Sequence, residues 1–72
     1  MFEIGDKVRI KKEHLKEYSD YKEHAGEIAT IIEPKTEDPY FDCELVWDNG
    51  DESSAKWEYL EPAFTTWKER YQ

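Results

Sequence analysis

The chain has 72 residues, the length of one small domain, and its formal net charge is −8. Folding at this length buries only about 60% of the surface of the unfolded chain, so the core needs a few large side chains. The negative charge makes the chain a poor nonspecific binder of nucleic acid. No apolar run approaches the roughly 20 residues that cross a bilayer, so we expect no membrane association.

The first predicted element is a β-strand that begins near Lys7. Val8 and Ile10 alternate with charged residues, and a period of two is typical of a strand with one face in the core. Residues 12–25 are polar, and we expect a long loop there, with one helical turn as an option. The basic residues that face water in and after the strand form a strip of Lys7, Arg9, Lys11 and Lys12.

Two more strands follow in chain order. Residues 26–33 are rich in β-branched side chains, which favours a second strand, and a cluster of turn-forming residues over 34–39 ends it. Residues 40–47 alternate between apolar and other side chains, which predicts the third strand. The core-facing residues of this third strand are Phe41, Cys43, Leu45 and Trp47.

Asn49-Gly50 lies between the third strand and a fourth predicted over residues 52–59. This dipeptide is a strong signal for a two-residue hairpin, because both central residues of a type I′ turn need positive φ. We therefore predict a type I′ turn over residues 48–51. The core-facing row expected in the fourth strand is Ala55, Trp57 and Tyr59, and Leu60-Glu61-Pro62 follows it.

The hydrophobic period changes in the last ten residues. Phe64, Trp67 and Tyr71 are spaced three and four apart, as on one face of a helix. A helix this short must dock on the domain or on a second chain, and a last short strand is the alternative. We therefore divide the chain into a β-domain over 1–62 and an extension over 63–72, through which a dimer is one option.

Four or five short strands must share one core and protect the edges of their sheet, and a closed or nearly closed barrel does both. The predicted fold class is all-β, a small five-stranded β-barrel with a short helical or stranded extension.

The sequence resembles the SH3-like barrels over about residues 2–62. The Gly-Asp-x-Val-x-Ile opening is similar to the KOW-type barrels, the Val-x-Trp-Asp-Asn-Gly hairpin to the Mib–Herc2 domains, and the size to small uncharacterised barrels of bacteria and phages. The segments that carry the resemblance are Phe2, Ile4-Gly5-Asp6-Lys7-Val8-Arg9-Ile10, Gly26, Ile31-Ile32, Val46-Trp47-Asp48-Asn49-Gly50 and Tyr59-Leu60-Glu61-Pro62. The resemblance implies an SH3-like fold, and because one fold hosts many functions it names no ligand.

The sequence contains no motif that points to catalysis. His14, His24 and Cys43 lack the paired spacing of a zinc site, and no nucleophile–base arrangement or phosphate-binding glycine loop is present. We therefore expect no enzyme activity, no metal and no cofactor. The N-terminus lacks the apolar region of a signal peptide. The single cysteine excludes an internal disulfide and fits a reducing cytoplasm, where we expect the protein.

The aromatic residues favour a protein-interaction module. Three Trp, five Tyr and three Phe are more than one small core holds, and Tyr and Trp are typical interface anchors. We predict Tyr18, Tyr21 and Trp67 as anchors for a protein partner, with core packing an equal alternative for the two tyrosines. Acidic side chains would steer a basic partner, and the candidates are Asp38, Asp42, Glu44 and Asp51.

Two other functions stay open at this point. In a KOW-like component of transcription or translation, the basic strip would contact phosphates, although the net charge disfavours this. Alternatively, the second half of the chain, with eleven acids and four bases over residues 33–72, would imitate nucleic acid and block a host protein.

Overall fold

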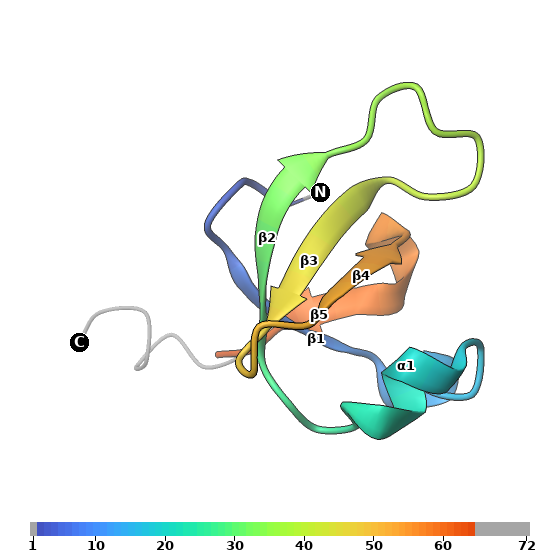
Figure 1. Cartoon of the computed structure of the whole chain (residues 1–72), viewed down its shortest axis with the longest axis vertical. Coiled ribbons are helices and arrows are strands. Elements are labelled where there is room, and N and C mark those ends of the chain that lie inside the picture. The colour runs from blue at the N-terminus through green and yellow to red at the C-terminus, as the bar shows by residue number, and fades with distance from the viewer. Residues whose placement is uncertain (1, 65–72) are drawn as a thin grey trace.

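The computed structural model describes residues 2–64, so most of the predicted extension, including Trp67, lies outside the described residues. The described strands form one antiparallel sheet in the order β4-β3-β2-β1-β5 (Figure 1). The strands are β1 (Lys7–Ile10), β2 (Ala29–Pro34), β3 (Cys43–Trp47), β4 (Glu52–Ala55) and β5 (Leu60–Pro62). The helical segments are the 3₁₀ turns η1 (Lys12–His14) and η2 (Trp57–Tyr59) and the helix α1 (Ser19–Glu23).

The sheet is strongly curled because a short link joins its two edge strands. In a flat sheet β4 and β5 would lie about 19 Å apart, which is four strand spacings of about 4.8 Å. Residues 56–59 alone join them, and three of these four form η2. A 3₁₀ turn rises only about 2 Å per residue, so the link spans roughly 13 Å. The sheet must therefore bend until its edges approach each other (Figure 1).

Strand pairing does not close this sheet into a barrel within residues 2–64, and the edge strand β5 shows why. The alternating hydrogen bonds between β1 and β5 turn the backbone groups of Leu60 and Pro62 away from β1. Pro62 has no N–H, and the N–H of Leu60 donates to the Trp57 carbonyl. The outer edge of β5 therefore offers no free donor to β4.

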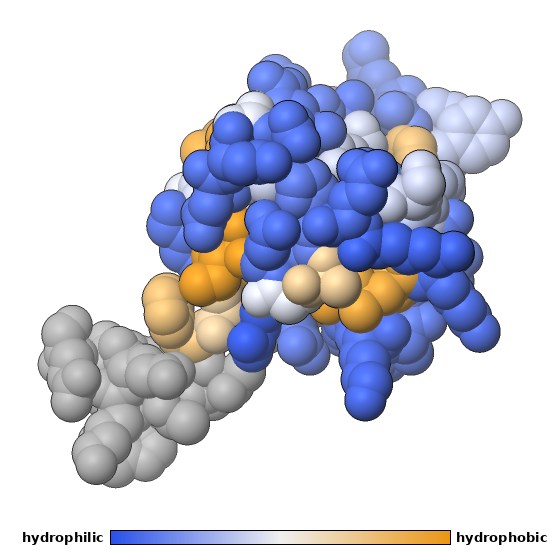
Figure 2. Space-filling model, turned by 60° about the horizontal axis from the view of Figure 1, so that its bottom comes forward, coloured by the Kyte–Doolittle hydropathy of each residue, from blue (hydrophilic) through white to orange (hydrophobic). Residues whose placement is uncertain are grey.

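The outer edge of β4 is covered by α1. The N–H of Trp47 donates to the Asp51 carbonyl at 2.8 Å. In an antiparallel pair every second residue bonds to the partner strand, so the N–H and C=O groups of Ser54, three residues after Asp51, point away from β3. There the Tyr21 hydroxyl donates to the Ser54 carbonyl at 2.6 Å. The helix thus blocks the edge at which another strand would pair. Figure 2 shows that the end of the molecule around α1 is mostly hydrophilic, with small hydrophobic patches.

The core confirms the predicted alternation in the first and third strands. The buried residues from these strands are Val8, Ile10, Cys43, Leu45 and Trp47, and they are joined by Tyr21, Ala29, Ile31, Ala55 and Leu60. Phe41 precedes β3 and is half-buried. Ile32 follows the buried Ile31 and so lies on the outer face of β2, 39% exposed, where the register shifts between Ile31 and Glu33.

The structure differs from the prediction in four places. The segment 12–25 holds η1 and α1 rather than a loop with a single turn. The second and third strands begin at Ala29 and Cys43, later than predicted. The fourth strand ends at Ala55, because the Asp42 carboxylate accepts the N–H of Trp57 and the chain turns into η2.

The reversal at Asn49-Gly50 is confirmed, but the predicted type I′ turn is wrong. The N–H of Gly50 donates to the Trp47 carbonyl at 2.9 Å. Gly50 has a φ of +95°, and within residues 2–64 positive φ occurs at glycines alone, so Asn49 lacks it. This is the pattern of a three-residue loop, in which a type I turn is followed by a left-handed glycine.

Candidate functional site

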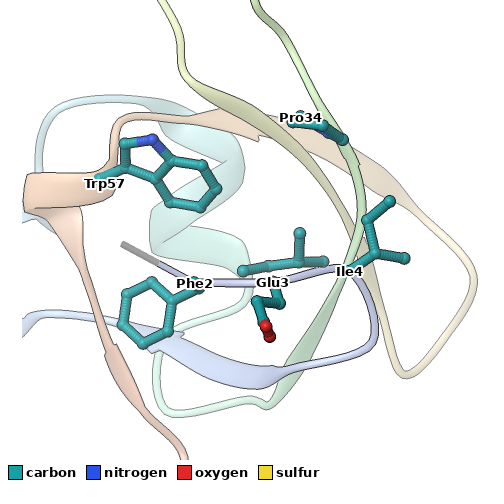
Figure 3. Close-up of a pocket in the computed structure, with 6 residues that line it drawn as sticks. Phe2, Glu3, Ile4, Pro34 and Trp57 are labelled. Atoms are coloured by element: carbon teal, nitrogen blue, oxygen red, sulfur yellow. The ribbon is translucent and has the colours of Figure 1, made fainter.

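An open apolar groove of about 470 Å³ lies between the N-terminal segment, the end of β2 and η2 (Figure 3). Phe2 and Trp57 stand on one side, with ring centroids 6.2 Å apart, and Ile4 and Pro34 stand on the other. The floor includes Ile31, which is 1% exposed. We call this feature the Trp57 groove, and its lining residues are Phe2, Glu3, Ile4, Ile31, Pro34 and Trp57.

A tight turn holds the N-terminal wall of the Trp57 groove in place. The N–H of Asp6 donates to the Glu3 carbonyl at 3.1 Å, and the Asp6 carboxylate accepts the N–H of Glu3 at 2.8 Å. Gly5 has a φ of +93°, as the third residue of a type II turn requires. Its N–H donates to the Ile31 carbonyl at 2.7 Å. The turn therefore fixes this segment against β2 and leaves Ile4 66% exposed at its corner.

The opposite wall depends on Asp42. Its Oδ2 accepts the N–H of Trp57 at 2.8 Å, and its own N–H donates to the Ala55 carbonyl at 2.9 Å. The ring of Tyr59, at the end of η2, packs against His14 with centroids 4.5 Å apart and planes tilted by 33°. These contacts hold η2 so that the half-buried Trp57 ring faces the groove.

The lining of the Trp57 groove suits binding. Its one titratable side chain is Glu3, so no acid–base pair or nucleophile lines it. Apolar walls open to water are typical of surfaces that bind another molecule. Sequence reasoning missed the groove because its walls come from three distant segments and because Trp57 was expected in the core. The sequence offered one usable signal for the groove: the apolar residues Phe2 and Ile4 lie outside every predicted strand.

The structure separates the predicted aromatic anchors. Tyr21 is fully buried, as the core-packing alternative expects and not as a surface anchor would be, and its hydroxyl donates to the Ser54 carbonyl at the edge of β4. Burial and the nearby Asp20 raise the pKa of Tyr21. Tyr18 is 41% exposed and packs edge-on against the Tyr21 ring, with centroids 5.1 Å apart. The third anchor, Trp67, falls outside the described residues.

Three of the four predicted steering acids lie around Lys35. The Lys35 Nζ is 4.0 Å from Asp38 and 3.7 Å from Glu44, and the Lys35 N–H donates to the Asp42 carbonyl. Asp38 Oδ1 also accepts the N–H groups of Tyr40 and Phe41, which hold the pKa of Asp38 below its ordinary value. These carboxylates already have partners within the domain.

The fourth acid, Asp51, belongs to a cluster around His24. The His24 ring is 5% exposed and stacks on Trp47 with centroids 4.7 Å apart and planes 10° from parallel. Its Nδ1 lies 3.1 Å from Glu27 and its Nε2 lies 3.3 Å from Asp51. Burial lowers the pKa of His24, but the two carboxylates outweigh that effect and raise it above the ordinary value.

A second polar chain ties α1 to the same hairpin. The Trp47 indole N–H donates to the Ser53 hydroxyl at 2.8 Å, and the Ser53 hydroxyl donates to the Asp20 carboxylate. Sequence reasoning missed both the His24 cluster and this polar chain, because their members come from two distant parts of the sequence: α1 with the residues that follow it, and the β3–β4 hairpin. The i, i+3 spacing of His24 and Glu27 was the one local signal.

The predicted basic strip follows the outer face of β1 into η1. Lys7 Nζ donates to the Thr30 hydroxyl at 2.7 Å, and Arg9 lies 3.9 Å from Glu61 on β5. Lys11 is half-buried and Lys12 is exposed. An acidic side chain thus interrupts the strip.

The remaining candidate groups are also placed. Cys43 is fully buried, and burial raises the pKa of its thiol to about 11. Within residues 2–64, no three His, Cys, Asp or Glu side chains are grouped as metal ligands. No helix in the described range has both the length and the apolar composition needed to traverse a membrane.

Comparison with known proteins shows a fold relationship. No family model matches the sequence, and no curated protein matches it either. The structure is similar to the NMR structure of the Bacillus subtilis protein YorP, with a TM-score of 0.69 and 23% sequence identity. The match covers 85% of this chain and 68% of that chain. At this identity the likeness shows a shared small β fold and carries no activity or ligand.

Proposed function

We propose that this protein is a small non-enzymatic protein-interaction module that docks a partner protein in the Trp57 groove. The observation that carries the proposal is the exposed apolar lining. Ile4 is 66% exposed at the corner of a turn that the three hydrogen bonds described above hold in place, so its exposure is built into the fold. A domain of this size has few apolar residues to leave in water, and a persistent apolar surface is typical of a docking site.

We also infer that the curled sheet is an SH3-like barrel and that the chain is a bacterial or phage protein of the cytoplasm. Three observations support this inference: the short β4–β5 link, the position of β1 between β2 and β5, and the likeness to a Bacillus subtilis protein. A buried single cysteine is compatible with a reducing compartment.

The nucleic-acid alternatives have less support. A phosphate-binding strip needs free cations, whereas Arg9 lies beside Glu61 and Lys7 donates to Thr30. Nucleic-acid mimicry would draw on the acids of the second half, and three of these, Asp38, Asp42 and Glu44, contact groups of their own domain, which leaves fewer free acids for it.

Affinity capture with a matched pair of variants tests the docking proposal. Ile4→Gln removes an apolar wall of the Trp57 groove, and Ile32→Gln changes an equally apolar residue, 39% exposed, that does not line the groove. We expect the wild type and Ile32→Gln to capture the same protein from a bacterial lysate and Ile4→Gln to lose it. Equal capture by all three would place the docking surface elsewhere and refute the proposal.

A further inference from the structure

We infer that the Trp57 groove takes a short peptide segment whose apolar side chains are flanked by lysine or arginine. This inference rests on the proposed function and adds the chemistry of the partner. It follows from the charges beside the groove, from the state of the nearby bases and from the charge of the whole chain.

Exposed acids lie in two of the chain segments that line the groove. Glu3 lies between Phe2 and Ile4 and is itself part of the lining. Glu58 follows Trp57, whereas Glu33 pairs with Glu44 and so lies on the outer face of β2, opposite Pro34. Unlike the acids around Lys35, the carboxylates of Glu3 and Glu58 make no ion pair or side-chain hydrogen bond among the described residues. They therefore stay free to meet a cation beside the groove.

The two lysines nearest in sequence to the groove do not offset these acids. Lys35 follows Pro34, but its ammonium group lies between Asp38 and Glu44. Lys56 precedes Trp57, and its Nζ lies over the Tyr59 ring, 6.0 Å from the centroid. The rim of the groove is thus negative at short range, as the whole chain is at long range with a net charge of −8.

The negative charge of the rim and of the whole chain restricts which molecules bind in the groove. A second copy of the chain brings the same net charge of −8 and the same acids, so like charges oppose self-association. Anionic lipid surfaces and nucleic acids are repelled for the same reason. A peptide segment with an apolar centre and basic flanks fits both the apolar lining and the negative charge. Its centre packs between the walls of the groove, and its flanks pair with the carboxylates.

Fluorescence anisotropy with three labelled peptides of about eight residues tests the inference. The first has a Leu-Ile-Pro centre with arginine flanks, the second keeps the centre with glutamate flanks, and the third keeps the arginines with a serine centre. At low salt, where exposed charge pairs are least screened, we expect the first peptide to bind about tenfold more tightly than either of the others.

A pair of charge-matched double variants locates the effect. Glu3→Gln/Glu58→Gln should weaken binding of the first peptide about fivefold, because it removes the carboxylate of the lining and the one next to Trp57. Glu13→Gln/Glu23→Gln changes the net charge equally with exposed acids on η1 and α1, and binding should stay within about twofold.

Each contrary outcome has a distinct meaning. Equal binding of the arginine and glutamate peptides, equal effects of the two double variants, or no saturable binding of the first peptide at about 1 mM would overturn the inference about chemistry. The docking proposal would still stand in those cases if Ile4→Gln alone lost the captured protein. It would fall if Ile4→Gln and Ile32→Gln captured alike.

Discussion

The two ends of the curled sheet use their aromatic residues in opposite ways. At the α1 end, Tyr21 and Trp47 are buried, and each donates a hydrogen bond, to the Ser54 carbonyl and the Ser53 hydroxyl. At the groove end, Phe2 and Trp57 are half-buried and leave apolar surface in water. The α1 end holds the fold together, whereas the groove end is the surface that we propose for a partner.

This difference follows from the cost of burying polar groups. Buried donors and acceptors need partners, so the α1 end is saturated with internal contacts and has little left for a ligand. The apolar groove has no such requirement, and burying it against a partner gains free energy that the domain alone does not collect. Substitutions at the two ends should therefore separate stability from binding.

The largest effect is expected at Tyr21. Tyr21→Ala empties a fully buried ring site in the core and should cost about 3–5 kcal/mol of unfolding free energy, which is most of the stability of a domain this small. Tyr21→Phe keeps the ring and leaves the Ser54 carbonyl without its donor, at a cost of about 1–2 kcal/mol. Urea denaturation followed by circular dichroism measures both. Similar midpoints for the two variants would mean that the ring does not pack as described.

The next effect is expected at the hairpin. Gly50 has a φ of +95°, where a β-branched side chain is strained, so Gly50→Val should destabilise the domain by about 1–2 kcal/mol. Gly50→Asn should cost less, because asparagine tolerates left-handed backbone better. Thermal melts compare the three proteins. A melting temperature of Gly50→Val equal to that of the wild type would contradict the three-residue loop.

A smaller, pH-dependent effect is expected at His24. Glu27 and Asp51 raise the pKa of His24 in the folded protein, whereas the pKa of a histidine in the unfolded chain is about 6.5. The protonated ring therefore stabilises the fold fully below about pH 6.5, and this contribution is lost as pH rises through the higher folded-state pKa.

Urea denaturation of His24→Gln as a function of pH checks this assignment. The wild type should lose stability as pH rises through the window above about 6.5, and the variant should lose that dependence whatever its absolute stability. A slope unchanged in the variant would show that other groups cause the pH dependence.

The smallest effect on stability is expected at the groove. Ile4 is 66% exposed, so Ile4→Gln should change the free energy of unfolding by less than about 0.5 kcal/mol. The same substitution should abolish partner capture. A large loss of stability in Ile4→Gln would show that the groove end also holds the fold together, and the contrast between the two ends would disappear.

Local patterns predicted the strands better than the segments between them. Val8, Ile10, Leu45 and Trp47 are buried as their alternation requires, because burial on one face of a strand is a local property with a period of two. Trp57 departs from the same rule, since an N–H bond to Asp42, fifteen residues away, converts the expected strand into a 3₁₀ turn. Tyr21 lies in a polar segment, and its burial depends on a free strand edge that local sequence does not reveal.

The sequence by itself determined which residues of the first and third strands face the core, where the main hairpin reverses and that the chain is acidic, because periodicity, turn chemistry and charge are carried by neighbouring residues. Only the tertiary structure decided that Tyr21 is buried, that His24 lies between two carboxylates and that Phe2, Ile4, Pro34 and Trp57 form one groove. These features join segments that are far apart in the chain, and the curl of the sheet sets their distances.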